Sequence, residues 1–260
     1  MKKIKRLVIK LGTSTLTHKT GLINIQQFEK LVKIIADIKN SGIEVVIVSS
    51  GAIGLGVGKL KLETKPTDMP TKMAVASIGQ CELMSLYDEF FGEYNHIVAQ
   101  ILLTKDIVDD EIKKRNLINN FNKLFDFSVI PIINENDSIS TSEIEEYRFG
   151  DNDTLSALVA KLCKADTLII LSDIDGLFDK DPNKYNDAKI IPIVTQITEE
   201  IKNLCGDTSS NQGTGGMITK ISAAEICLEN NISMAIINGS RPENLYEIIA
   251  GKNIGTWFIK

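Results

Sequence analysis

A glycine-rich tract in the C-terminal third of the chain runs into a helical pattern and carries a lysine one turn later, at residues 213–220 (GTGGMITK). The free backbone N–H groups and the positive dipole end of a helix start form a site for phosphate. Lys220 adds a mobile charge that can reach phosphate oxygens. The spacing is not that of a Walker A loop. The tract therefore predicts a different phosphate site, although a plain glycine-rich loop with a surface lysine has the same pattern.

A second lysine stands where an apolar residue is expected. Lys10 lies inside the apolar run 7–11 and is followed by Gly12, Thr13 and Ser14. An unpaired ammonium in such a strand is costly. A lysine that reaches water from the strand end is the simple alternative, but the small polar residues that follow favour a phosphate role.

Polar segments also follow other apolar runs, at residues 49–54, 134–137, 150–153 and 172–177. Each has an ordinary explanation: Asp151 and Asp153 suit a helix cap, and Asp137 suits a turn. The glycines of residues 51–58 are off-register for a dinucleotide motif. Taken together, two lysines, two glycine loops and several acids at strand ends exceed what turns require. They predict one ligand site at the carboxyl edge of a sheet.

Composition narrows the class of protein. The formal net charge of −5 and the lack of a basic block argue against general nucleic-acid binding, and no apolar run reaches membrane-spanning length. The four cysteines form no CxxC pair, which is typical of reduced thiols in a cytoplasmic protein. The two histidines are isolated, so no histidine-built metal site or catalytic triad is expected.

Six short apolar runs predict buried strands, and longer helical patterns separate them. The alternation indicates an α/β fold, a three-layer αβα sandwich with a mainly parallel central sheet. One helix is expected from the apolar residues between Phe28 and Ile38, with Asn24 as its cap and Gly42 as its stop. Residues 138–150 and 174–191 are less regular and are expected to form hairpins or lids. The expected strands are residues 7–11, 45–48, 97–103, 129–133, 168–171 and 234–237.

The ordered set of motifs resembles the amino acid kinase family over nearly the whole chain. The segments that carry the resemblance are residues 8–14 (VIKLGTS), 48–53 (VSSGAI), 133–137 (INEND), 149–157 (FGDNDTLSA), 171–177 (LSDIDGL) and 213–220 (GTGGMITK). Residues 134–137 and 150–153, together with 76–80 (ASIGQ), are most similar to members that use glutamate as the phosphoryl acceptor.

The resemblance implies a reaction and its ligands. The γ-phosphoryl group of ATP would pass to the side-chain carboxylate of L-glutamate, giving L-glutamyl 5-phosphate for proline biosynthesis. Mg2+ would accompany ATP, held by phosphate oxygens and water, with no protein ligand assigned. Proline is implied as a feedback inhibitor, and the chain as a homo-oligomer, a dimer or a tetramer.

Domain organisation follows from the same resemblance. Many bacterial members carry an additional C-terminal domain similar to RNA-binding modules, whereas this chain stops soon after a strand expected at residues 255–258. We expect a single amino acid kinase domain over residues 1–260, without that addition. Its N-terminal part would bind glutamate and its C-terminal part ATP.

The resemblance also assigns roles to residues. Lys10 and Lys220 would flank the phosphates as catalytic residues, with Asp153 holding both lysines in place. Asp137 would pair with the α-ammonium group of glutamate. The implied ATP site comprises Lys10, Gly12, Ser172, Asp173, Thr214, Gly215, Gly216, Met217, Ile218, Thr219 and Lys220. The implied glutamate site comprises Ser50, Gly51, Ala52, Asp137 and Asn152.

Other readings stay open at this point. A family member that phosphorylates N-acetylglutamate or uridylate shares the fold, but an N-acetylated substrate has no ammonium group for Asp137. A non-catalytic sensor of nucleotide or amino acid is the alternative from another class, because fold alone does not determine function. A nicotinamide-dependent dehydrogenase is a more distant alternative.

Overall fold

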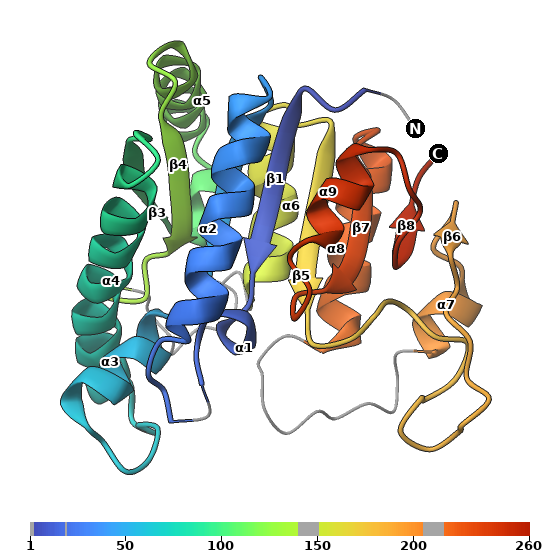
Figure 1. Ribbon diagram of the computed structural model, residues 1–260, viewed down its shortest axis with the longest axis horizontal. Coiled ribbons are helices and arrows are strands. Elements are labelled where there is room, and N and C mark those ends of the chain that lie inside the picture. The colour runs from blue at the N-terminus through green and yellow to red at the C-terminus, as the bar shows by residue number, and fades with distance from the viewer. Residues whose placement is uncertain (1–2, 19, 140–150, 205–215) are drawn as a thin grey trace.

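The computed structural model describes residues 3–18, 20–139, 151–204 and 216–260, and these form one eight-stranded sheet between two layers of helices (Figure 1). The strand order is β3-β4-β2-β1-β5-β7-β8-β6, and every neighbouring pair is parallel except β7 with β8. The predicted α/β sandwich is therefore confirmed. The strands are β1 (Arg6–Leu11), β2 (Glu44–Ser49), β3 (Val98–Leu103), β4 (Ile130–Glu135), β5 (Thr167–Ser172), β6 (Ile193–Val194), β7 (Ser233–Asn238) and β8 (Thr256–Phe258).

Helices cover both faces of the sheet, and each face has its own apolar core. In Figure 1, α2 and α9 lie in front of the sheet while α6 and α8 lie behind it. One core joins the sheet to α5, α6 and α8, and the other joins it to α2, α4 and α9. The helices are α1 (Thr13–Leu16), α2 (Ile25–Asn40), α3 (Ala52–Leu60), α4 (Met69–Gly92), α5 (Glu111–Asp126), α6 (Asn152–Leu162), α7 (Glu199–Asn203), α8 (Met217–Glu229) and α9 (Asn244–Ile249), with a 3-10 turn, η1 (Lys105–Val108).

Local signals set the ends of α2 as the sequence predicts. The side chain of Asn24 accepts a hydrogen bond from the backbone N–H of Gln27, which satisfies a free donor of the first turn. Gly42 follows the helix with φ of +92°, a conformation that glycine adopts without steric cost.

Two details of the sheet differ from the sequence prediction. Ile97 precedes β3 and is 66% exposed, because β3 is an edge strand that pairs with β4 alone among the described strands. The sequence pattern predicts a strand buried on both faces over residues 97–103. At Ile97 this prediction is wrong. Strand β8 confirms the strand expected at residues 255–258, whereas β6, which pairs with it, is too short to give a sequence pattern.

The irregular segments have different outcomes. A β-bridge pairs Phe178 with Ile190, and Ile191 N donates to the Leu177 carbonyl, so residues 174–191 return on themselves as the predicted hairpin. Of residues 138–150, all but the first two lie outside the described residues. In the described part of the chain, no helix is both long and apolar enough to cross a membrane.

Helices α3 and α4 approach each other with backbone in contact. A Cβ atom added to Gly79 of α4 would lie 1.7 Å from the Ala52 carbonyl oxygen and 2.5 Å from Gly56 N. A Cβ atom on Gly56 of α3 would lie 2.1 Å from the Val75 carbonyl oxygen. Glycine at these two positions therefore sets the distance at which α4 supports the start of α3, beside the end of β2.

Candidate active site

Lys10 stands on the face of β1 that looks toward α6 and α8. Side chains alternate along a strand, and Val8, two residues earlier, belongs to the core shared with these helices. Lys10 continues that row at the carboxyl end of the strand, where its side chain is 10% exposed. An ammonium group so placed needs a partner, and α6 supplies one.

Asp153 joins two lysines from distant parts of the chain. Its Oδ1 lies 2.7 Å from Lys10 Nζ, and its Oδ2 accepts a hydrogen bond from Lys220 Nζ at 3.0 Å. Thr219 Oγ1 also lies 3.0 Å from Oδ2. The carboxylate is fully buried, so the predicted arrangement, with Asp153 between the two lysines, is what the fold produces.

The start of α6 holds this carboxylate in place. Asp151 is the N-cap, and its Oδ1 accepts a hydrogen bond from the backbone N–H of Asp153. Of the two acids that suit a helix cap in the sequence, Asp151 is the cap, whereas Asp153 pairs with the two lysines. An acid in the first turn is further stabilised by the helix dipole.

The two acids differ in their titration. Burial disfavours the ionised form of Asp153, but the charges of Lys10 and Lys220 outweigh it and lower the pKa of Asp153 below its ordinary value. Burial and the nearby charge of Asp153 raise the pKa of Asp151. Asp151 Oδ2 is buried without a hydrogen-bond partner in the described structure. The site therefore keeps Asp153 ionised beside the lysines.

The glycine tract leads into α8 as predicted. Gly216 is the N-cap and supplies no side-chain cap hydrogen bond to the first turn, which begins with Met217. Thr219 is half-buried, Ile218 is exposed, and Lys220 is buried. Thr214 and Gly215 lie outside the described residues. The first turn of α8 thus places Lys220 beside Asp153.

The other predicted nucleotide residues end neighbouring strands. Gly12 follows β1, and a Cβ atom there would lie 3.7 Å from Lys10 Nζ. Ser172 ends β5 and donates to Asp173 Oδ1 at 3.1 Å, with Asp173 exposed beside it. Because β1 and β5 are parallel neighbours, these residues share the carboxyl edge of the sheet with Lys10.

A second group of predicted residues lies at the ends of β2 and β4 and the start of α6. Ser50 Oγ accepts a hydrogen bond from Asn152 Nδ2 at 2.7 Å, which brings these two together. Gly51 has φ of +110° and starts α3 at Ala52. Asp137, after β4, lines a shallow depression together with Ala52.

Sequence reasoning gave no individual role to the side chains that support this group. Asn134 Oδ1 accepts from Asn152 Nδ2 at 3.0 Å, and Asn134 Nδ2 donates to Gln80 Oε1 at 2.9 Å. Ser49 Oγ lies 2.8 Å from the hydroxyl of fully buried Tyr87. Two signals were available: Gln80 and Asn134 are polar positions within otherwise apolar patterns, and they lie in the segments 76–80 and 134–137 that carry the family resemblance.

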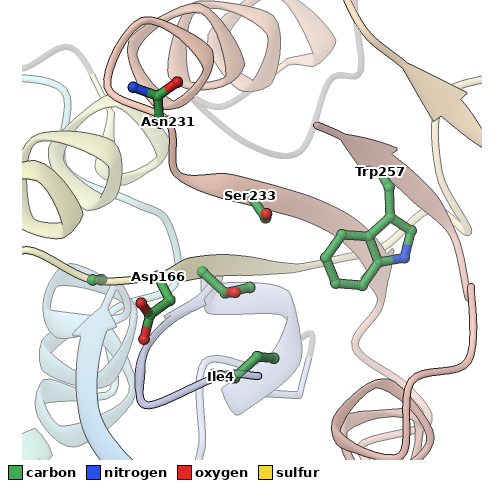
Figure 2. A pocket seen from close by; sticks show the side chains of 7 residues that line it. Ile4, Asp166, Asn231, Ser233 and Trp257 are labelled. Carbon is green, nitrogen blue, oxygen red and sulfur yellow. The ribbon is translucent and has the colours of Figure 1, made fainter. Parts of the chain in front are cut away.

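A cavity of about 100 Å3 lies at the opposite edge of the sheet (Figure 2). Thr167 and Ser233, the first residues of β5 and β7, form part of its wall, so it faces away from Lys10. Its full lining is Ile4, Ala165, Asp166, Thr167, Asn231, Ser233 and Trp257.

The chain is similar to known proteins along nearly its whole length. Residues 5–238 match the family model described as the amino acid kinase family. The chain is 54% identical over 260 residues to a glutamate 5-kinase of Clostridium perfringens, covering all of this chain and 97% of that protein. It is 49% identical over 259 residues to a glutamate 5-kinase of Listeria monocytogenes, covering 99% of this chain and 94% of that protein.

A longer relative and two solved structures complete the comparison. A glutamate 5-kinase of Caldanaerobacter subterraneus is 49% identical over 98% of this chain, which spans 68% of that protein. The UMP kinase structure from Bacillus anthracis has a TM-score of 0.67 at 17% identity, covering 99% of this chain and 97% of that one. A carbamate kinase from Giardia lamblia, bound to AMP-PNP, has a TM-score of 0.66 at 19% identity, with 98% of both chains covered. At these identities the two structures show a shared fold.

Proposed function

Because the chain belongs to the amino acid kinase family, we propose that it transfers the γ-phosphoryl group of ATP to the side-chain carboxylate of L-glutamate. The observation that carries the proposal is the buried Asp153 between Lys10 and Lys220, at one edge of the sheet with Ser50 and Asn152. The identity of 54% to a glutamate 5-kinase over the whole chain supports glutamate as the acceptor.

The proposed reaction requires neutralisation of the negative charge on the phosphates more than it requires proton transfer. A glutamate carboxylate is ionised at neutral pH, so its oxygen can attack the γ-phosphorus without a general base. A bond forms between that oxygen and phosphorus while the bond from phosphorus to the β–γ bridging oxygen breaks, and ADP leaves with the electron pair. The barrier comes from bringing an anion to a polyanion, which alignment and positive charge lower.

Lys10 and Lys220 are the groups that supply this charge in the proposal. Both come from buried positions and share Asp153 as counterion, so their ammonium groups are oriented before the substrate arrives. Preorganised charge of this kind stabilises a transition state without reorganisation during the reaction. Asp153 acts through the lysines, as the residue that positions them.

The proposed nucleotide site uses the C-terminal part of the chain together with the end of β1. Gly12 and Ser172 lie at neighbouring strand ends, and the residues from Gly216 to Lys220 start α8. The N–H groups at the start of α8 suit a phosphate. Asp173, Thr214 and Gly215 complete the proposed set.

The proposed glutamate site uses the N-terminal part. Gly51 and Ala52 start α3, whose N–H groups suit a carboxylate, and Ser50 adds a hydroxyl. Asp137 supplies the anion for the α-ammonium group, and Asn152 adds a polar contact. This division gives the proposed single kinase domain of residues 1–260 two halves with separate ligands.

Mg2+ enters the proposal as part of the substrate Mg-ATP, carried by phosphate oxygens and water. Within the described ranges, no group of three or more acidic, histidine or cysteine side chains could hold a metal ion. The acid at the centre of the site, Asp153, already has two lysine partners. No protein ligand for Mg2+ is assigned.

The wider context is part of the same proposal. The product, L-glutamyl 5-phosphate, would be the first intermediate of proline biosynthesis, in the cytoplasm. Proline is proposed as a feedback inhibitor and the assembly as a homo-oligomer, a dimer or a tetramer. A proline titration of activity and a light-scattering mass address these two points directly.

An ADP-release assay with Mg-ATP tests the function. L-glutamate, N-acetyl-L-glutamate, L-aspartate and UMP are compared as acceptors, with hydroxylamine present to trap an acyl phosphate. We expect glutamate-dependent ADP release and a hydroxamate product. Turnover with N-acetyl-L-glutamate or UMP alone would reassign the acceptor site, and ATP binding without turnover would favour a sensor.

A further inference from the structure

A chain of side-chain hydrogen bonds links helix α4 to the proposed glutamate site. It runs from Gln80 on α4 to Asn134 on β4, then to Asn152 at the start of α6, and ends at Ser50 after β2. Gln80 and Asn134 are 8% and 3% exposed, so this end of the chain is shielded from water. Buried amides depend on protein partners, because an unpaired one is costly.

A backbone group sets the direction of every bond in this chain. The N–H of Glu135 donates to Asn134 Oδ1 at 2.9 Å, and a backbone N–H is always a donor. Asn134 must therefore turn Oδ1 to the backbone and Nδ2 to Gln80. Gln80 in turn must present Oε1, and Asn152 must present Nδ2 to Asn134 Oδ1.

This direction determines what the ligand meets. Asn152 Nδ2 is used by Asn134 and Ser50, which leaves Asn152 Oδ1 as an acceptor, and no donor to it is recorded among the described residues. Ser50 Oγ already accepts a hydrogen bond, which leaves its O–H to donate. An acceptor beside a donor is the complement of an ammonium group and a carboxylate carried on one carbon.

We propose that Gln80 is a positioning residue for the amino acid substrate: it holds the Asn134 amide in the one orientation that makes Asn152 an acceptor and Ser50 a donor toward the ligand. Without Oε1 of Gln80, the buried Nδ2 of Asn134 loses its partner, and the amide is held on its other side alone, by the Glu135 N–H and Asn152. An amide displaced in this way no longer receives Asn152 Nδ2 in the same place, so Asn152 and Ser50 lose their positions toward the ligand. This inference rests on the proposed use of glutamate.

The test is a double-mutant cycle on the full chain with L-glutamate and Mg-ATP. Gln80→Met keeps the side-chain length but removes the acceptor oxygen. We expect a roughly tenfold rise in the glutamate KM, as for a buried donor left without a partner, with kcat and the ATP KM within about twofold of wild type. In an Asn152→Ala background the same change should add little, because Gln80 acts through Asn152.

A matched control separates positioning from general damage to α4. Leu86→Met alters a half-buried side chain of the same helix that packs on the apolar core, away from the amide chain, and should leave the glutamate KM unchanged. If Gln80→Met is not recovered folded, Gln80→Asn is used in the same cycle, since it withdraws the oxygen by one methylene group.

Three results would overturn the inference: an unchanged glutamate KM in the Gln80 variant, an equal rise in the ATP KM, or effects of Gln80 and Asn152 changes that multiply. These results are distinct from failure of the proposed function. If the wild-type chain makes no hydroxamate from glutamate, the proposed function itself is wrong, whereas wild-type turnover with a multiplicative cycle refutes the role of Gln80 alone.

Discussion

The contact between α3 and α4 gives a sharp test of how the fold positions the site. Gly79→Ala adds one methyl group where a Cβ atom would stand 1.7 Å from the Ala52 carbonyl oxygen, and ordinary contact begins near 3.4 Å. Both atoms of the conflict are tied to helical backbone, so a side-chain rotation cannot relieve it. The two helices must separate by about 1.7 Å at this point.

The expected cost follows from this overlap. Overpacking in a well-packed interior costs about 1–3 kcal/mol, and a backbone clash belongs at the upper end. For a domain of this size, each kcal/mol lowers Tm by roughly 2–4 °C, so Gly79→Ala should lower Tm by roughly 6–12 °C. Because Ala52 moves with α3, the glutamate KM should also rise, by roughly ten- to a hundredfold, with the ATP KM little changed.

The same helix supplies the control. Gly92 is the last residue of α4, and a Cβ atom there meets nothing within 4 Å. Gly92→Ala should therefore leave activity unchanged and stabilise the chain by up to about 1 kcal/mol. Thermal unfolding by circular dichroism and initial rates of ADP release measure both effects. A Tm for Gly79→Ala within about 1 °C of wild type would refute the reasoning, since it would mean that the helices can part at no cost.

Four further outcomes are expected. Lys10→Ala or Lys220→Ala should lower kcat on the order of a thousandfold in folded protein; near-normal turnover would remove that lysine from the phosphate site. Asp137→Asn should raise the glutamate KM about tenfold and leave the ATP KM unchanged; the reverse pattern would move Asp137 to the nucleotide. Burial and Asp153 raise the pKa of Asp151 above its unfolded value near 3.8, so ionised Asp151 opposes folding at neutral pH, and that penalty is lost as pH falls through the folded pKa. Asp151→Asn should accordingly raise Tm at pH 7 with a gain that vanishes near pH 4, and a pH-independent gain would contradict this linkage. Proline should inhibit the wild-type enzyme, and a flat titration would dispose of that regulation.

Elements with a strong local pattern could be predicted from the sequence. The continuous apolar runs around Val8 and Ile169 are strands buried on both faces, as such runs indicate. The short strand β8 was also expected, but β6 has only two residues, and a segment so short pairs because its neighbour β8 is in place. The exposure of Ile97 could not be predicted either, because an apolar run does not reveal which strand lies at the edge of the sheet.

Some residues of the candidate site could likewise be predicted from the sequence, and others could not. Lys10 and Lys220 could be found because a charge or a glycine tract interrupts a strong pattern, and the family resemblance placed Asp153 between them. Gln80 and Asn134 lie in segments that carry the family resemblance, but the sequence gives neither an individual role. Their meaning depends on a backbone N–H of Glu135 and on the closeness of α4, β4 and α6, which only the folded chain provides.

The electrostatic design of the lysine pair explains why an acid is needed at its centre. Two ammonium groups buried at one strand edge repel each other, and each loses hydration that must be replaced. Asp153 lies within 3.0 Å of both and keeps a lowered pKa, so it stays ionised and cancels one of the two charges. The two ammonium groups stand at one edge of a chain whose formal net charge is −5. The attraction for a phosphate is therefore local to this edge of the sheet. Removing Asp153 would raise the positive charge there, but it would also leave Lys10 and Lys220 without the counterion that positions them.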